Sequence, residues 1–329
     1  MTYKPPKLIE FVRDGLVEQE HYGFLLKISE DKNILRIGDD DNYPYYLRSC
    51  AKPLQASLIV DLNLDEYFNM TENEVAICCA SHAGEEIHTK TVKDFLNRMG
   101  LNESFLKCGL QVPLSKVEQK RLTLNGEEAS ALHNNCSGKH SMMLAACVKE
   151  GFSTDDYFKI NHPLQFLIKK KIYELCEIKG EYPSTKDGCG VPIYSMPLEN
   201  MLRGYLNLFL NSKYKKIKDA FLNNPYLIGG ENRLDTAIMT ASDNLIAKVG
   251  AGGLCIVVNL QKKEALLVKI MDCDMKARAL VLIEALRQLC WLDENSFKNE
   301  LLQAQNQIDI LTKHGEKIGQ AEFRFQMPA

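Results

Sequence analysis

A serine and a lysine three residues apart stand in the stretch Arg48-Ser49-Cys50-Ala51-Lys52-Pro53. A serine hydroxyl is a weak nucleophile until a neighbouring base takes its proton. A lysine amine can be that base only when it is neutral, which requires a pKa well below the ordinary value of about 10.4. Residues three apart on one helical turn share a face. The spacing therefore predicts Ser49 as a nucleophile and Lys52 as its base.

Pro53 leaves the local structure of this pair open. A proline disfavours the helical conformation of the residue before it, and it is itself favoured as the first residue of a helix. The pair lies either on a helical turn or in a loop just ahead of a helix through the apolar residues 54–62. By itself Ser-x-x-Lys is a common chance pattern, and two solvated polar residues at a helix start would also produce it.

Further motifs give the pair a context, because together they resemble the type II asparaginase family. This is the Ser-Lys type found in rhizobia and other bacteria, not the threonine-dependent type. The resemblance covers most of the chain, and the motifs appear in the family's order. Besides residues 48–55 they are Val17-Glu18 with His21-x-Gly23, Ala80-Ser81-His82-Ala83-Gly84-Glu85, His133-Asn134-Asn135-Cys136-Ser137-Gly138-Lys139-His140, Asp187-Gly188-Cys189-Gly190-Val191-Pro192, Arg233-Leu234-Asp235-Thr236, Lys248-Val249-Gly250-Ala251 and Val268-Lys269-Ile270.

The resemblance implies a catalytic set of four in which Ser81 relays protons and Lys269 is the second amine. Taken alone, Ser81 reads as a turn residue or helix cap, and Lys269 as a solvent-facing residue of an alternating strand. A second amine near Lys52 has a physical use. Two like charges a few ångströms apart disfavour double protonation, so one amine stays neutral near pH 7.

Cys136 and Cys189 lie 53 residues apart and do not form the paired-cysteine pattern of structural zinc. The resemblance nevertheless implies a zinc site held by both thiolates and the amine of Lys139, with water as the fourth ligand. A lysine coordinates only when neutral, and the charge of the metal favours that state. Zinc would position the substrate, whereas activation of water by the metal is the alternative.

Three residues are candidates for substrate binding. The planar fork of Arg48 suits a carboxylate, although a surface ion pair is an alternative. Asp187 and His140 flank the proposed metal ligands and could orient them, and His140 could instead cap a helix start. The chain departs from the family at Gly252-Gly253, where an acidic residue usually follows Lys248-Val249-Gly250-Ala251. That departure puts substrate affinity and specificity in doubt.

Composition indicates an ordinary globular protein. The 329 residues are 45 % hydrophobic and 25 % charged, and the net charge of −3 gives no sign of a nucleic-acid or membrane partner. No apolar run reaches the ~18 residues of a membrane span, and the N-terminus lacks a signal-peptide core, so we expect a cytoplasmic location. The 11 cysteines then remain mostly free and buried, with Cys50 a bystander beside Ser49.

Periodicity predicts intermixed helices and strands, hence a mixed or antiparallel sheet covered by helices. The resemblance points to the serine β-lactamase and glutaminase architecture. We expect one catalytic domain over residues 1–329, with a weak boundary near 180–188. The expected strands are 22–28, 75–79, a hairpin of 253–259 and 264–271, and a strand near 321–326. The expected helices are 87–99, 139–150, 163–178, 197–211, 232–242, 275–291 and 296–306.

The resemblance implies a homodimeric amidohydrolase that converts L-asparagine to L-aspartate and ammonia. Two alternatives stay open. One is a glutaminase or another amidase on the same scaffold. The other is a zinc-dependent amino-acid binding protein with little catalysis, for which Gly252-Gly253 is the only support in the sequence.

Overall fold

The computed structural model describes residues 5–40 and 42–328 and is a mixed α/β fold, as predicted. Its main sheet has the strand order β10-β11-β1-β2-β9-β8-β7, with β3 also paired to β2, and a small sheet has the order β4-β6-β5. Every pairing in both sheets is antiparallel. The strands are β1 (Lys7–Arg13), β2 (Leu16–Ser29), β3 (Ile34–Ile37), β4 (Tyr45–Tyr46), β5 (Ser184–Lys186), β6 (Pro192–Met196), β7 (Leu245–Gly250), β8 (Leu254–Asn259), β9 (Glu264–Ile270), β10 (Asp309–Leu311) and β11 (Lys317–Phe323).

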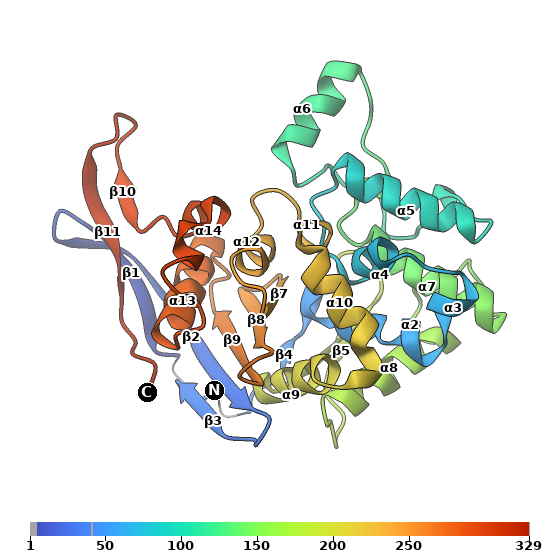
Figure 1. The fold of residues 1–329 in the computed structure, drawn as a ribbon, viewed down its shortest axis with the longest axis horizontal. Helices are drawn as coiled ribbons and strands as arrows, with labels where there is room; N and C mark the ends of the chain where they lie inside the picture. The colour runs from blue at the N-terminus through green and yellow to red at the C-terminus, as the bar shows by residue number, and fades with distance from the viewer. Residues whose placement is uncertain (1–4, 41, 329) are drawn as a thin grey trace.

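The helices fall into two groups around the main sheet (Figure 1). One group packs on the strands, and the other forms a helical region beyond β7. The α-helices are α1 (Ala51–Ala56), α2 (Leu58–Asp61), α3 (Leu64–Tyr67), α4 (Glu72–Cys79), α5 (Glu86–Arg98), α6 (Lys116–Asn125), α7 (Ser137–Glu150), α8 (Pro163–Leu175), α9 (Leu198–Phe209), α10 (Lys215–Asn223), α11 (Pro225–Ile228), α12 (Leu234–Thr240), α13 (Met275–Gln288) and α14 (Glu300–Gln305). Short 3₁₀ turns are η1 (Arg48–Cys50), η2 (Glu103–Phe105), η3 (Ala131–His133), η4 (Ser212–Tyr214) and η5 (Ser296–Lys298).

The sheet is buried where it meets the helical region. Every residue of β7 and β8 is buried, because α12 packs on β7 while α9 and α13 pack on β8. A strand covered on both faces has no polar and apolar alternation. β7 accordingly shows no alternating pattern in the sequence. β8 is equally buried, and the β8–β9 hairpin was predicted with the help of the polar turn at residues 261–263 between its strands.

Most of the predicted helices are confirmed within a few residues at each end, among them α5, α7, α8, α9 and α13. The predicted strand at residues 75–79 is wrong, because Val75 to Cys79 form the second half of α4. Thr71 and Glu74 make a reciprocal capping box that starts this helix. These five apolar residues resemble a buried strand in the sequence. The reason is that α4 packs against several helices, so this half of it has no polar face and no helical periodicity.

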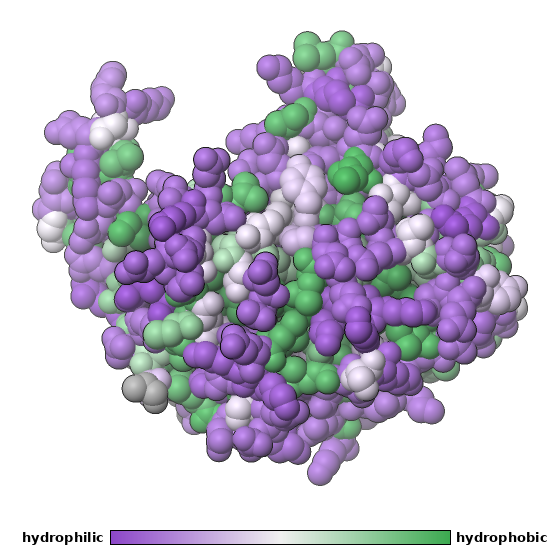
Figure 2. All heavy atoms as spheres, viewed as in Figure 1, coloured by the Kyte–Doolittle hydropathy of each residue, from purple (hydrophilic) through white to green (hydrophobic). Residues whose placement is uncertain are grey.

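The segment from Ala80 to Glu85, which carries Ser81, is a loop that leaves the C-terminal end of helix α4. The side of the molecule shown in Figure 2 is mostly hydrophilic, with scattered apolar patches, some of them on the arm that carries α6. In the described part of the chain, none of the helices has both the length and the apolar character that a bilayer span requires.

Candidate active site

The Ser49–Lys52 pair lies on one continuous turn formed by η1 and the start of α1. Pro53 falls in the first turn of α1, where the missing N–H of proline costs no intrahelical hydrogen bond. Of the two structures that the sequence left open, the helical turn is therefore the observed one. Ser49 is half-buried, whereas Lys52 is only 1 % exposed.

The residue before Ser49 has a strained backbone. Arg48 has a φ of 48°, in the left-handed region that a residue with a Cβ seldom adopts. Such strain persists only where the surroundings enforce it, and it is concentrated at functional sites. Here η1 packs against β7, and Tyr205 donates a 2.8 Å hydrogen bond from its hydroxyl to the carbonyl of Cys50.

The amine of Lys52 joins three segments that are distant in the sequence. It donates to the Ala80 carbonyl at 2.7 Å, the Ser81 hydroxyl at 2.9 Å and the Asn135 carbonyl at 2.8 Å. Burial lowers the pKa of Lys52 to about 8, and the charges of Lys139 and Lys248 also lower it. Three donated bonds use all three protons of an ammonium group, so this is the geometry of the protonated lysine.

Ser81 thus lies beside Lys52, and its role as a proton relay stays a prediction. The hydroxyl of Ser49 makes no hydrogen bond to that amine among the described residues. For Lys52 to act as a base on Ser49, it must lose a proton and turn its lone pair to the Ser49 hydroxyl. The two residues share a helical turn, so rotation of side chains is sufficient for this change.

Lys269 is not brought into this cluster. Its amine donates to the carbonyls of Gly252 at 2.7 Å and Ile270 at 2.9 Å, and it lies 5.7 Å from the centre of the Tyr45 ring. Burial lowers the pKa of Lys269. The charges with the largest effect on the pKa of Lys52 are those of Cys136, Lys139, Lys248 and Cys189. The catalytic role of Lys269 stays a prediction without a geometric contact.

Lys248 is the amine that sequence reasoning missed. It is fully buried on β7 and donates to the Val249 carbonyl at 2.9 Å and to the Asp235 carboxylate at 3.5 Å. The Cys50 thiol donates to the carbonyl of Lys248, which places the strand directly beside η1. The motif Lys248-Val249-Gly250 could have indicated this residue, because a lysine within an apolar segment is costly to bury and is therefore a candidate for a functional role.

The register of the sheet explains why Lys248 and Lys269 are not equivalent. Lys248 pairs with Ile256 of β8, and Ile256 pairs with Leu267 of β9. Lys269 lies two residues beyond Leu267, so it is displaced from Lys248 by about 10 Å across the strands and about 7 Å along them. Of the two lysines, Lys248 is on the strand that contacts η1.

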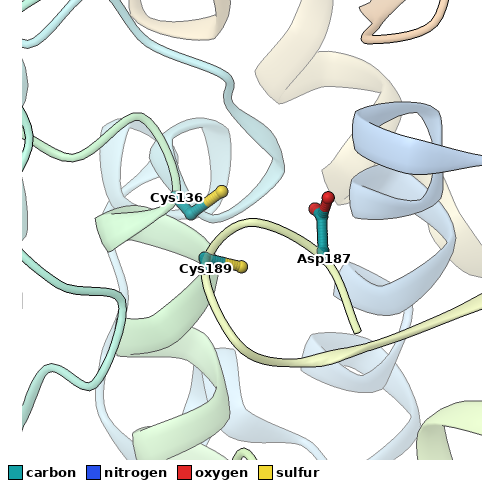
Figure 3. Close-up of side chains that lie close together, drawn as sticks. All are labelled: Cys136, Asp187 and Cys189. Atoms are coloured by element: carbon teal, nitrogen blue, oxygen red, sulfur yellow. The ribbon is translucent and has the colours of Figure 1, made fainter. Parts of the chain in front are cut away.

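A cluster of possible metal ligands adjoins the Lys52 amine. One ligand atom each of Cys136, Asp187 and Cys189 lies within 4.8 Å of the other two, and the amine of Lys139 is 3.0 Å from the Cys189 sulfur. Figure 3 shows the two sulfur atoms directed to the side on which Asp187 lies. The start of α7 and the loop before β6 therefore bring together the residues that the sequence left 53 positions apart.

The protonation of the two thiols fits a metal-binding pair. A hydrogen bond from Cys189 lowers the pKa of Cys136 well below its usual value, and the same bond raises the pKa of Cys189. One thiolate and one thiol thus share a proton beside the Lys139 amine. Two sulfurs, one nitrogen and a nearby carboxylate are ligands that zinc accepts, so these residues fit the predicted ion.

Arg48 and Asp187 contact each other beside this cluster. The Nε of Arg48 donates to the Asp187 carboxylate at 2.9 Å, with the arginine side chain 38 % exposed. Burial opposes ionisation of Asp187, but the charges of Lys139 and Arg48 outweigh it and hold its pKa below the usual value. Asp187 is therefore an anion between two cations. The other N–H donors of Arg48 make no hydrogen bond within the described residues, so they can bind a carboxylate.

His140 does not cap a helix start, which was the alternative that the sequence left open for it. It lies inside α7, and its Nδ1 is 2.7 Å from the hydroxyl of Tyr157. Its Nε2 is buried without a partner in the described structure, and burial lowers the pKa of the ring well below the usual value. A role for His140 in substrate binding remains a prediction.

The family comparison defines the class to which this site belongs. The family described as L-asparaginase II matches residues 9–323, so the chain belongs to it, and that membership supports an amidohydrolase. A comparison with curated proteins found no match.

Two solved structures are similar over most of the chain. One is a candidate beta-lactamase from Bacteroides dorei DSM 17855, with 10 % identity and a TM-score of 0.43, covering 76 % of this chain and 84 % of the other. The second is a beta-lactamase from Mycobacterium bovis, with 14 % identity and a TM-score of 0.44, covering 81 % of this chain and 94 % of the other.

We expect the double variant Cys136→Ser, Cys189→Ser to lose bound zinc. Two hydroxyls replace the sulfur ligands, so zinc measured by atomic absorption should fall from about one ion per chain to near zero. Cys290→Ser is the matched control, because Cys290 is exposed and lies outside the cluster. Undiminished zinc in the double variant would contradict the assignment of these ligands.

Proposed function

We propose that the protein hydrolyses the side-chain amide of L-asparagine to L-aspartate and ammonia through a serine ester. One observation carries this proposal. In a chain of the L-asparaginase II family, the buried amine of Lys52 has a pKa lowered to about 8 and lies on the same turn as Ser49. An amine with a pKa near the working pH suits general-base catalysis.

The first half of the reaction forms the ester. Neutral Lys52 takes the proton of the Ser49 hydroxyl while the Ser49 oxygen attacks the amide carbon of the substrate. The negative charge on the carbonyl oxygen develops beside the start of η1, where backbone N–H groups lack intrahelical partners. The proton then passes through Lys52 or Ser81 to the nitrogen, and the carbon–nitrogen bond breaks to release ammonia.

The second half regenerates the enzyme. A water molecule gives a proton to Lys52 as its oxygen attacks the β-aspartyl ester. The ester bond to Ser49 breaks, the serine oxygen regains the proton, and L-aspartate leaves. We assign Lys248, rather than Lys269, as the second amine of this centre, because its charge helps to lower the pKa of Lys52.

Zinc, when bound by Cys136, Cys189 and Lys139, would supply a fixed positive charge for orienting the α-amino-acid end of the substrate. The chain's own residues provide the rest of that orientation. Arg48 offers a guanidinium to the α-carboxylate, and Asp187 offers a carboxylate to the α-ammonium group. This pair of opposite charges matches the zwitterionic end of a free amino acid.

A glutaminase or other amidase on this scaffold is the second candidate, and comparison of L-asparagine with L-glutamine separates the two. The homodimer, which the resemblance implies, and the cytoplasmic location, which was inferred from the N-terminal sequence and the apolar runs, both stay predictions. A binding protein with little catalysis would retain ligand-induced thermal stabilisation without ammonia release.

Ser49→Ala should abolish ammonia release from L-asparagine, with a loss of at least about a thousandfold in kcat, because it removes the group that forms the ester. Cys50→Ala is the matched control. The pKa of Cys50 is raised by burial to about 12, so its thiol is not the nucleophile and the variant should remain active. Ammonia release is measured with L-asparagine and L-glutamine in parallel. Full activity in Ser49→Ala, or a strong preference for glutamine, would refute the proposal.

The two amines can be separated by matched substitutions. Lys248→Met should lower kcat by about a hundredfold or more, because it removes a charge that helps to lower the pKa of Lys52. Lys269→Met should retain activity within about tenfold, since its partners are backbone carbonyls of a turn. The reverse order of effects would restore Lys269 as the second catalytic amine.

The pH dependence follows from the lowered pKa of Lys52. The neutral base increases as pH rises through about 8, so kcat/KM should climb from pH 6 to 9 and level off above 9. The unfolded chain holds this proton up to about 10.5, so the same lysine makes the free energy of unfolding rise with pH between about 8 and 10.5. Chemical denaturation of Lys52→Met should show that this part of the rise is lost. A rate that is flat from pH 6 to 9 would count against Lys52 as the base.

A further inference from the structure

A pocket of about 300 Å³ is lined by residues of α13 and α14, of the segment that leads into α12, and of the edge strand β7. Figure 1 shows these three helices side by side. Three cationic side chains line it, namely Arg233, Lys276 and Arg278, and we call it the arginine pocket. Its other polar lining consists of side-chain amides, including those of Gln305 and Gln307, and its lining contains no aspartate or glutamate. The pocket is therefore cationic and rich in hydrogen-bond donors.

The cations of the arginine pocket have no carboxylate partners among the described residues. Arg278 is 8 % exposed, and the hydrogen bond that it donates joins Nη1 to the Gly250 carbonyl at 3.0 Å. The Nε atoms of Arg278 and Arg233 are both buried without a hydrogen-bond partner. Lys276 is exposed and lies 4.9 Å from the centre of the Phe11 ring.

A buried guanidinium without a counter-charge is costly, because desolvation removes water that nothing else replaces. Other arginines of the chain follow the usual rule, such as Arg98 with Glu74 and Arg203 with Glu199. The guanidinium fork matches the paired oxygens of a carboxylate or phosphate. We propose that the arginine pocket is a binding site for a small oxyanion, held by Arg278 and Arg233 with Lys276 at its rim.

The main rival to a bound oxyanion is an internal ion pair. Asp235 follows Arg233 and Leu234, its Oδ1 is buried without a partner, and its Oδ2 faces the Lys248 amine. A rotation that paired Asp235 with Arg278 would balance the charge without any ligand. In that case Arg278 would not be available to an added anion, so a binding measurement distinguishes the two.

An oxyanion in this pocket would connect the two elements that hold Lys248. Arg278 is bonded to the end of β7 at Gly250, and Arg233 directly precedes α12, which carries Asp235. A ligand that bridges both arginines fixes α12 against β7, and with them the pair of Asp235 and Lys248. This consequence rests on the proposed function of Lys248, whereas binding of the oxyanion does not.

The test is isothermal titration calorimetry of the full chain with inorganic phosphate and, separately, with succinate, at ionic strength held constant with chloride. We expect saturable binding of one ion per chain. Affinity should fall by about tenfold or more in Arg278→Gln and in Arg233→Gln, because each loses a charge-assisted hydrogen bond. Arg287→Gln is the matched control on α13, since Arg287 is exposed and paired with Glu284 outside the pocket.

Binding of either probe that depends on both arginines supports the site and identifies whether phosphate or carboxylate is its chemistry. Absence of saturable binding of both probes overturns the proposal, as does binding that is unchanged in both variants. If Arg278→Gln does not fold, Arg233→Gln and the exposed Lys276→Gln decide the question in the same way. Because no turnover is measured, failure here leaves the proposed hydrolysis untouched, and failure of hydrolysis leaves this site standing.

Discussion

The candidate site depends on a single buried ammonium group. The amine of Lys52 is almost completely removed from water, and its three protons are satisfied by Ala80, Ser81 and Asn135, which come from two separate loops. Without those acceptors a buried lysine would be strongly destabilising. The loop after α4, the segment before α7 and the turn of η1 are therefore fixed relative to one another by the same interaction that presents the proposed base to Ser49.

Lys52 is one of four buried lysines in the described part of the chain, with Lys139, Lys248 and Lys269. Two of the other three face groups that can carry negative charge. Lys139 faces the two thiols of Cys136 and Cys189, and Lys248 faces Asp235. Arg48 and Asp187 form a further pair at the half-exposed rim. Burial is the main cause of the lowered pKa of Lys52; Lys139 and Lys248 lower it further, whereas Cys136 and Cys189 raise it. The charges of Lys139 and Arg48 keep Asp187 ionised. The amine of Lys52 is the one proposed to exchange protons.

Sequence reasoning found those parts of the site that lie in short motifs, and it failed where burial removes the pattern. The Ser49–Lys52 spacing and the β8–β9 hairpin are local and could be predicted, as could the helices with one polar face, such as α5. The buried segment 75–79 was mistaken for a strand, and β7 gave no strand pattern, because full burial leaves no periodicity. Which of the two motif lysines lies on the strand that contacts η1 is decided by strand order, which spacing does not encode.

The Gly252-Gly253 departure and the placement of Lys269 have one structural explanation. Both glycines have positive φ, 77° and 71°, which is the backbone of a tight hairpin turn between β7 and β8 that glycine adopts without strain. A Cβ on Gly253 would lie 2.1 Å from the carbonyl oxygen of Ile270, so that position requires glycine in this packing. The amine of Lys269 binds the carbonyls of Gly252 and Ile270 and thereby ties this turn to the end of β9. The turn directly follows Lys248-Val249-Gly250, so Lys269 supports the strand that carries Lys248. The backbone carbonyl of Gly252 accepts a hydrogen bond from the Lys269 amine, as an acidic side chain at this position could also do.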